Sequence, residues 1–276
     1  MTHRIDAWPS RPRGAGWVWV VLALVGAVGF VVAPTVVAGD PYGAGIGDGR
    51  ALGDAAHVAV VDFLGRHSAA VTGTFGDLTH YWAQYHGVKV VFALVAAVAL
   101  ALFGGRLSRT ARIASTRLDR VRWAAAGGIL AAAAVAAMVL AVANVQGALA
   151  PVSSALSLLP ASGGADLATA RASVSTGIAD GAHDPAVAVL VHDFGRYHAV
   201  LAICLGVVVV LLAALAVVVG RRARTAERGT ALRPLAAAAT GVFAAAAAGL
   251  AVIVVANVGT ALDPAPALRL FFAGSA

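Results

Sequence analysis

The chain alternates between long, uninterrupted apolar blocks and short polar connections. The blocks cover approximately residues 17–38, 88–103, 123–145, 199–219 and 235–258. Four of them have the roughly 20 residues that an α-helix needs to cross a hydrocarbon layer of about 30 Å. The block 88–103 is shorter, but Tyr81, Trp82 and Tyr85 precede it and can lie at the membrane interface. The pattern predicts an all-α integral membrane protein with five transmembrane helices.

The charges of the connecting segments predict how these helices are oriented. The head before the first block and the segments 106–122 and 221–233 contain fourteen arginines and only three acidic residues. The remaining segments contain six basic residues and ten aspartates. Because short basic segments stay on the cytoplasmic side, we expect a plasma-membrane protein with a cytoplasmic N-terminus and an extracytoplasmic C-terminus.

The chain then divides into an N-terminal helix, two helical hairpins and the segments between them. We expect the following parts: cytoplasmic head and first helix 1–38, extracytoplasmic segment 39–87, hairpin 88–151, extracytoplasmic segment 152–198, hairpin 199–264 and extracytoplasmic tail 265–276.

The first apolar block has a second interpretation. A basic head, an apolar stretch and Val36-Val37-Ala38 resemble a cleavable secretory signal. The stretch is longer than a usual signal core, which favours a retained helix that Pro34 bends or ends.

The two long extracytoplasmic segments are predicted to be largely helical. Residues 39–49 form a glycine- and aspartate-rich loop, and the chain turns helical from Ala51. One helix face carries a run of apolar residues at alternating spacings of four and three: Val71, Phe75, Leu78, Trp82 and Tyr85. In the second segment, Asp184-Pro185 is typical of a helix N-cap followed by proline at the first helical position, so a helix can run from there into the fourth span.

Three polar motifs recur in the same order and indicate an internal duplication. The seven residues from His80 to His86 and those from His192 to His198 both read His, any residue, aromatic, small, Gln or Arg, Tyr, His, at an offset of 112. Arginine-rich motifs follow at 105–111 and 220–226, and Ala-Asn-Val then recurs at 143–145 and 256–258. The hairpins are therefore predicted to be duplicated copies related by a pseudo-twofold axis along the membrane normal.

The repeated motif suggests chemistry at the membrane interface through His80, Tyr85, His86, His192, Tyr197 and His198. Histidines six residues apart differ by roughly 240° around a helix, so the two in one motif cannot chelate one ion. A haem or metal site would need one histidine from each copy, such as His86 and His198. Otherwise these side chains hydrogen-bond to lipid headgroups, carbonyls or water.

Asn144 and Asn257 lie near the ends of their apolar blocks. An amide in hydrocarbon needs a partner, so we expect interhelical hydrogen bonds. The alternative is a polar constriction in the path of a small-molecule or lipid transporter.

Composition narrows the functional classes. The chain is 60% hydrophobic and 12% charged, and its net charge of +7 is confined to loops, which argues against nucleic-acid binding. The single cysteine, Cys204, excludes an intramolecular disulfide. Without a catalytic motif, the sequence favours a non-catalytic accessory or scaffold subunit that contacts a membrane-protein partner or a second copy. A haem or metal protein and a transporter remain the alternatives.

Overall fold

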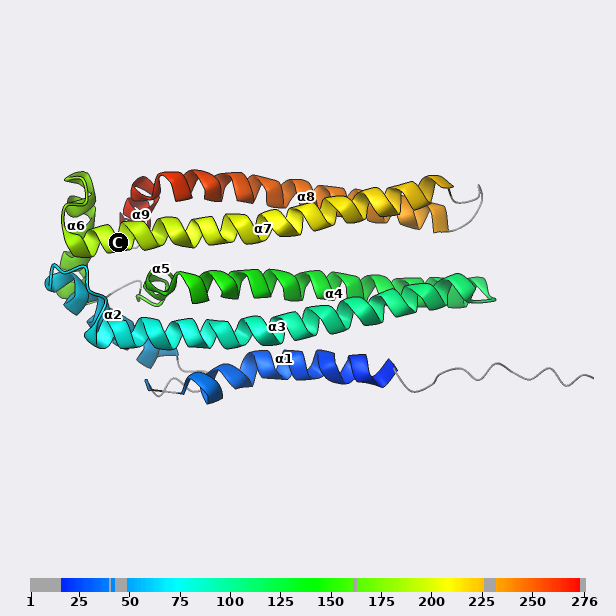
Figure 1. Cartoon of the computed structure of the whole chain (residues 1–276), viewed down its shortest axis with the longest axis horizontal. Coiled ribbons are helices and arrows are strands. Elements are labelled where there is room, and N and C mark those ends of the chain that lie inside the picture. The colour runs from blue at the N-terminus through cyan, green and yellow to red at the C-terminus, as the bar shows by residue number, and fades with distance from the viewer. Residues whose placement is uncertain (1–15, 40, 43–48, 161–162, 226–231, 274–276) are drawn as a thin grey trace, which may run out of the picture. The chain divides into compact units, whose positions relative to one another are not determined.

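The computed structural model describes residues 16–39, 41–42, 49–160, 163–225 and 232–273, and its regular elements are all helices (Figure 1). The helices of this part are α1 Gly16–Ala38, α2 Gly49–Gly65, α3 Gly73–Ile113, α4 Arg117–Leu149, α5 Pro151–Leu156, α6 Gly164–Ala179, α7 Pro185–Thr225, α8 Leu232–Leu262 and α9 Pro264–Ala273. Five of them, α1, α3, α4, α7 and α8, are long and apolar enough to cross a membrane. The all-α, multi-pass membrane class predicted from the apolar blocks is therefore confirmed.

Some sequence predictions fall outside the described residues. These are the arginine-rich head, most of the loop 39–49 and the middle of the segment 221–233.

The spans predicted over 88–103 and 199–219 are the middle parts of much longer helices. Both α3 and α7 contain 41 residues. The start of α7 is as predicted: the Asp184 carboxylate accepts the backbone N–H groups of Ala186 at 2.8 Å and Val187 at 3.3 Å. Proline at the first helical position has no N–H that would need a partner there.

One local prediction was wrong, and of the two alternatives for Pro34, that it bends or ends the first helix, the second was wrong. The helix expected from Ala51 is interrupted, because α2 ends at Gly65 and α3 begins only at Gly73. His67, with φ of 47°, and Gly73, with φ of 64°, turn the chain there. Pro34 does not end α1, which continues to Ala38. The proline lies in the last turn and is fully buried, so packing offsets the hydrogen bond that it cannot donate.

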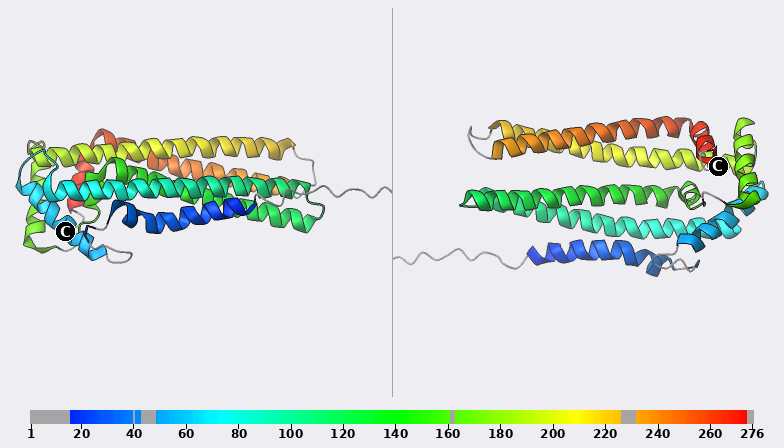
Figure 2. Two further views of the ribbon diagram at one scale, coloured as in Figure 1. Left: turned by 60° about the horizontal axis from the view of Figure 1, so that its bottom comes forward. Right: turned by 180° about the vertical axis from the view of Figure 1, so that it is seen from behind.

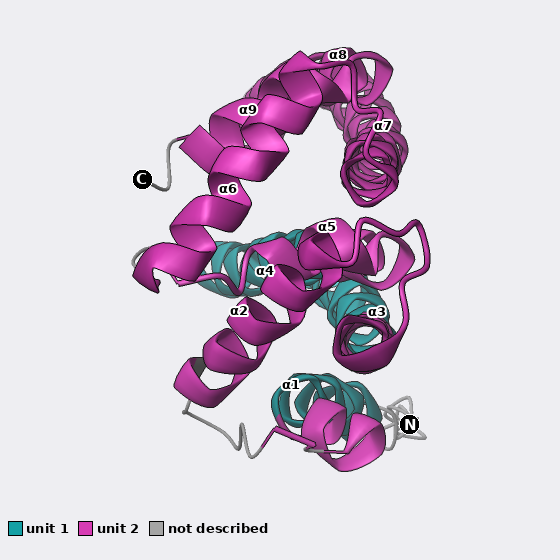
Figure 3. Ribbon diagram, turned by 90° about the vertical axis from the view of Figure 1, so that its left-hand side faces the viewer, with its two compact units in different colours: residues 1–31, 91–140 teal, residues 32–90, 141–276 magenta. Residues whose placement is uncertain are grey.

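Contacts divide the chain into two compact units, Met1–Val31 with Val91–Leu140, and Val32–Val90 with Ala141–Ala276 (Figure 3). In the first unit, glycines bring helices together. A Cβ atom on Gly26 would lie 2.7 Å from the backbone nitrogen of Ala96, and one on Gly127 would lie 3.0 Å from the Gly104 carbonyl oxygen. α1 and α4 therefore both approach α3 closely, as small residues permit in membranes.

The second unit contains the α7–α8 hairpin and a group of helices that we call the helical cap: α2, residues 73–90 of α3, α5, α6, the first turns of α7, and α9. α7 and α8 run side by side in every view (Figures 1 and 2). The cap encloses a hydrophobic core whose centre is completely buried, with Phe63, Phe75, Leu78, Leu190 and Leu268. Phe75 and Leu78 of the predicted apolar face belong to this core, and Trp82 and Tyr85 pack against it. Val71 packs against it too, but it precedes α3.

Candidate functional site

The repeated histidine and the repeated asparagine of the first hairpin are hydrogen-bonded to each other. His86 on α3 and Asn144 on α4 are joined by a 2.8 Å contact between Nδ1 and the amide Oδ1. An amide oxygen only accepts hydrogen bonds, so the imidazole Nδ1–H is the donor. Asn144 is only 6% exposed, and the bond links the two helices of the hairpin.

The second hairpin contains the same pair. His198 on α7 and Asn257 on α8 are joined by a contact of 2.6 Å between Nδ1 and Oδ1. The amide nitrogen of Asn257 donates to the Ile253 carbonyl at 2.8 Å, which fixes the orientation of the amide with its oxygen toward the histidine. Each of the two asparagines thus contacts a helix other than its own, and the partners are the repeated histidines.

The aromatic surroundings of the two histidines also correspond. The ring four residues earlier meets each imidazole edge-on, with centroids 4.5 Å apart for Trp82 and His86 and 4.6 Å apart for Phe194 and His198. The preceding tyrosine lies edge-on as well, at 5.8 Å in the first copy and 5.5 Å in the second. These rings hold the imidazoles in place and align Nδ1 with the asparagine oxygen.

The two histidines differ at the other ring nitrogen. Nε2 of His86 is buried and has no hydrogen-bond partner within the described part of the chain. A Cβ on Gly147 would lie 2.7 Å from this imidazole ring, so glycine is needed for the ring to fit against α4. Because Nδ1 carries the donated proton, Nε2 of the neutral ring presents a lone pair and no proton.

Further polar side chains connect α5 to the long helices and one hairpin to the other. The Trp82 indole N–H donates to the Ser154 hydroxyl at 2.9 Å, and the Gln146 amide donates to the Tyr197 carbonyl at 3.3 Å. The Asp193 carboxylate accepts the backbone N–H of Ser153 at 2.7 Å. Together with the two histidine–asparagine pairs, these residues form what we call the polar belt: Trp82, His86, Asn144, Gln146, Ser153, Ser154, Asp193, Tyr197, His198 and Asn257.

Asp193 lies inside the protein and does not pair with the nearby arginine. It is three residues before Arg196, a spacing that permits an exposed ion pair on a helix, but Asp193 is buried and accepts a backbone N–H of the first turn of α5 instead. The first residue of α5, Pro151, has no N–H, and the first amides of a helix have no partner within it. The Asp193 carboxylate satisfies one of these amides, that of Ser153, and its negative charge complements the positive end of the helix dipole. By contrast, Asp62 and Arg66, four residues apart on the chain, do form an ion pair, at 3.3 Å.

Sequence reasoning missed Gln146, Ser153 and Ser154. Gln146 lies two residues after Asn144 in an apolar block, and an amide there needs a partner just as the asparagine does. Nothing in the sequence indicates that the two serines face Trp82 and Asp193, because those contacts depend on the fold.

The remaining histidines of the repeated motif lie outside the polar belt. His80 and His192 are exposed, and His80 contacts the Gln84 amide of its own helix at 2.9 Å. Within the described residues, no cluster of three or more His, Cys, Asp or Glu side chains could hold a metal ion. Ligation by one histidine from each hairpin, and the transport path through the two asparagines, stay predictions.

Two histidine–aspartate contacts join α2 and the turn that follows it to other helices of the helical cap. His57 Nε2 lies 3.0 Å from an oxygen of Asp166 on α6, and His67 Nδ1 is bonded to Asp184, the N-cap of α7. The hydrogen bond from His67 is the largest cause that lowers the pKa of Asp184 below its ordinary value. The pKa of Asp166 is lowered too, chiefly by the backbone N–H of Leu167 and to a lesser extent by His57.

No protein-family model, curated protein or solved structure matches this chain. The fold and the polar belt therefore define the class on their own: a multi-pass α-helical membrane protein whose repeated polar residues bind one another.

Proposed function

We propose that this chain is a non-catalytic accessory or scaffold subunit of a membrane complex, and that its helical cap contacts the partner. The observation that carries the proposal is the mutual bonding within the polar belt. The two histidine–asparagine pairs and the Asp193 carboxylate each form a hydrogen bond that joins two helices. Such groups fix the relative positions of helices, which is the role of a rigid scaffold.

The proposed location is the plasma membrane, with the arginine-rich segments in the cytoplasm and the helical cap outside. The described segment 106–122 contains six arginines and one acid, at the ends of α3 and α4 opposite the polar belt. The same charge bias at 221–233 supports a common orientation for both hairpins. The matching contacts of the two histidine–asparagine pairs support the proposal that the hairpins are duplicated copies.

The partner surface that the cap offers best lies along α6 and α9. A hollow of about 670 Å³ is lined there by residues that include Ile178, Pro266, Arg269 and Leu270. Leu270 is 72% exposed and Leu262, at the end of α8, is 82% exposed. Asp263 also lines the hollow, so its one cation, Arg269, is matched by one carboxylate. Large exposed side chains beside such a hollow suit a protein partner that presents an apolar residue and polar groups.

The proposal is tested by crosslinking in native membranes. A photo-crosslinking amino acid at position 270 should give one adduct of defined mass, whereas the same group at Val58, which is exposed on α2, should give none. Leu270→Glu should release the chain from its complex on native gels, and Val58→Glu should leave the complex intact. A chain that runs as a lone monomer from native membranes, without an adduct at position 270, contradicts the proposal.

The second candidate is a haem or metal protein, and one observation favours it. His86 donates Nδ1–H to an amide oxygen and leaves Nε2 unpartnered, as ligating histidines in proteins commonly do. Purified protein titrated with haem would then show a Soret band that His86→Ala and His198→Ala each abolish. The exposed His80→Ala variant is the control. A band that survives both substitutions, or no band at all, rejects this candidate.

A further inference from the structure

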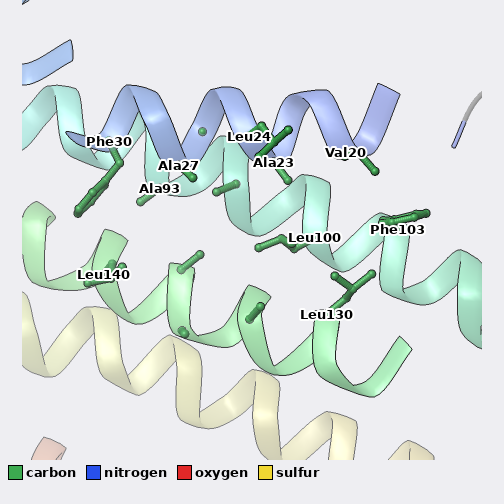
Figure 4. Close-up of a pocket in the computed structure, with 15 residues that line it drawn as sticks. Val20, Ala23, Leu24, Ala27, Phe30, Ala93, Leu100, Phe103, Leu130 and Leu140 are labelled. Carbon is green, nitrogen blue, oxygen red and sulfur yellow. The ribbon is translucent and has the colours of Figure 1, made fainter. Parts of the chain in front are cut away.

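The first compact unit contains an apolar groove that the polar belt does not use. It measures about 670 Å³, and its walls come from α1, α3 and α4 (Figure 4). All the lining side chains are apolar, and many are small: Val20, Ala23, Leu24, Gly26, Ala27, Phe30, Ala93, Ala96, Leu100, Phe103, Leu130, Ala133, Ala136, Ala137 and Leu140. A space of this size is in the range of small-molecule sites, and in a bilayer it must be filled with hydrocarbon.

The groove has the length of one lipid leaflet. Each wall uses a stretch of eleven residues, 20–30 on α1, 93–103 on α3 and 130–140 on α4. Ten steps of 1.5 Å give about 15 Å, which is half of a hydrocarbon core of about 30 Å. Val20, Phe103 and Leu130 lie at one end of the groove, and Phe30, Ala93 and Leu140 lie at the other (Figure 4). A single acyl chain lying along the helices fits this length.

The end at Val20, Phe103 and Leu130 continues toward the arginine-rich segment. Arg106 follows Phe103 by three residues on the same α3 face, since residues three apart are neighbours on a helix surface. Trp17 precedes Val20 by three residues on α1, and Trp123 precedes Leu130 by two turns on α4. Both tryptophans are exposed, as expected of residues at the level of the lipid headgroups.

The charge at this end is strongly positive. The segment 106–122 contains Arg106, Arg109, Arg112, Arg117, Arg120 and Arg122. Its one acid, Asp119, is engaged at the start of α4, where its carboxylate accepts the Thr116 hydroxyl at 2.8 Å and its backbone N–H donates to that hydroxyl at 3.0 Å. Basic side chains beside a gap between transmembrane helices attract anionic headgroups.

We propose that this groove binds an anionic phospholipid, with one acyl chain along α1, α3 and α4 and the phosphate beside Arg106. The lipid would fill the space that Ala133, Ala136 and Ala137 leave open and would strengthen the contact of α1 with the rest of its unit. The site is independent of the proposed scaffold function, because it uses none of the residues of the helical cap or the polar belt.

The test uses the full chain in mixed micelles with equal amounts of phosphatidylglycerol and phosphatidylcholine, and native mass spectrometry counts the bound lipid. Phosphatidylglycerol should be retained preferentially. Ala136→Leu narrows the groove and should displace the bound lipid, whereas Ala132→Leu, at an exposed position of the same helix outside the groove, should retain it.

The headgroup contact is tested separately. Arg106→Gln should lower the ratio of bound phosphatidylglycerol to phosphatidylcholine roughly fivefold, which is the effect expected of one basic residue near an anionic headgroup. Arg222→Gln, in the second hairpin, is the matched control and should leave the ratio unchanged. Equal retention of both lipids by the unsubstituted chain overturns the proposal. So does lipid binding that survives Ala136→Leu, or a chain dimer that Ala136→Leu dissociates, because the groove would then be occupied by a second copy.

Discussion

Breaking one histidine–asparagine bond should cost more in the first hairpin than in the second. Asn144→Leu removes the partner of His86 Nδ1 and leaves both ring nitrogens without a hydrogen bond, because Nε2 already has none within the described residues. A buried polar group left unsatisfied costs about 1–3 kcal/mol. Asn257→Leu removes the matching bond of His198, whose Nε2 is not among the buried atoms that lack a partner.

The bond itself is measured by a double-mutant cycle. Interhelical hydrogen bonds in membranes contribute about 0.6 kcal/mol on average and about 1.7 kcal/mol at most. We expect a coupling energy in this range between His86→Phe and Asn144→Leu, and a similar value between His198→Phe and Asn257→Leu. The free energy of unfolding is obtained by reversible SDS titration in mixed micelles, with tryptophan fluorescence as the signal, since Trp82 lies against His86.

The reasoning is refuted by a coupling energy near zero in both hairpins, since the bonds would then contribute nothing to the fold. It is also refuted if Asn257→Leu destabilises the protein more than Asn144→Leu. The lack of a partner at Nε2 of His86 would then have no effect on stability.

Three further predictions follow from the described contacts. Asp193→Ala should destabilise the protein by about 1–3 kcal/mol because the Ser153 N–H loses its acceptor, and Asp193→Asn should recover most of the loss, as measured by SDS titration. His67→Ala should raise the pKa of Asp184 toward its ordinary value of about 3.9, as followed by carboxyl NMR. Because the folded pKa is lowered, this contact stabilises above that ordinary value and is lost as the pH falls through the lowered one. Gly26→Leu should cost about 1–3 kcal/mol, since its side chain meets the backbone of α3.

Each of these has a matched control. Arg196→Ala changes an exposed side chain beside Asp193 and should leave stability within about 0.5 kcal/mol. His183→Ala removes another imidazole near the start of α7 and should not move the pKa of Asp184. Gly128→Leu adds a side chain where nothing lies within 4 Å of a Cβ atom, so it should be tolerated in the same assay. Equal costs for Gly26→Leu and Gly128→Leu would mean that α1 does not pack closely on α3.

The apolar blocks predicted the fold class because membrane helices obey a simple constraint. Every backbone group in hydrocarbon must be satisfied within its own helix, so about 20 apolar residues in a row imply one spanning helix. The points at which one helix ends and the next begins were harder to predict. The turn between α2 and α3 depends on a positive φ at His67, a non-glycine residue, and on contacts of the Arg66 guanidinium with Thr72. Neither follows from hydrophobic periodicity.

The candidate site was predicted residue by residue, but most of its pairings were not. Recurrence in the sequence identified His86, His198, Asn144 and Asn257, and the need of a buried amide for a partner indicated interhelical bonds. The identity of that partner depends on how far α3 and α4 are shifted along each other, and the sequence does not give this shift. Local spacing alone would pair Asp193 with Arg196, whereas its partner is the start of α5, forty residues away in the chain.

The two hairpins differ in the residues around their matching histidine–asparagine bonds. At an offset of 113, Gln146 corresponds to Gly259, which presents no side chain and has open space around its Cβ position. The Gln146 amide therefore donates a hydrogen bond from α4 to the Tyr197 carbonyl of the other hairpin, whereas Gly259 has no side chain that could donate one. We expect Gln146→Leu to cost about 0.5–1.5 kcal/mol, the net contribution of a typical hydrogen bond, and Gly259→Gln to be tolerated or mildly stabilising because it removes a helical glycine. SDS titration measures both costs. If Gly259→Gln destabilises the protein more than Gln146→Leu does, the space at Gly259 is needed in the second hairpin. The hydrogen bond from Gln146 then does not explain how the hairpins are joined.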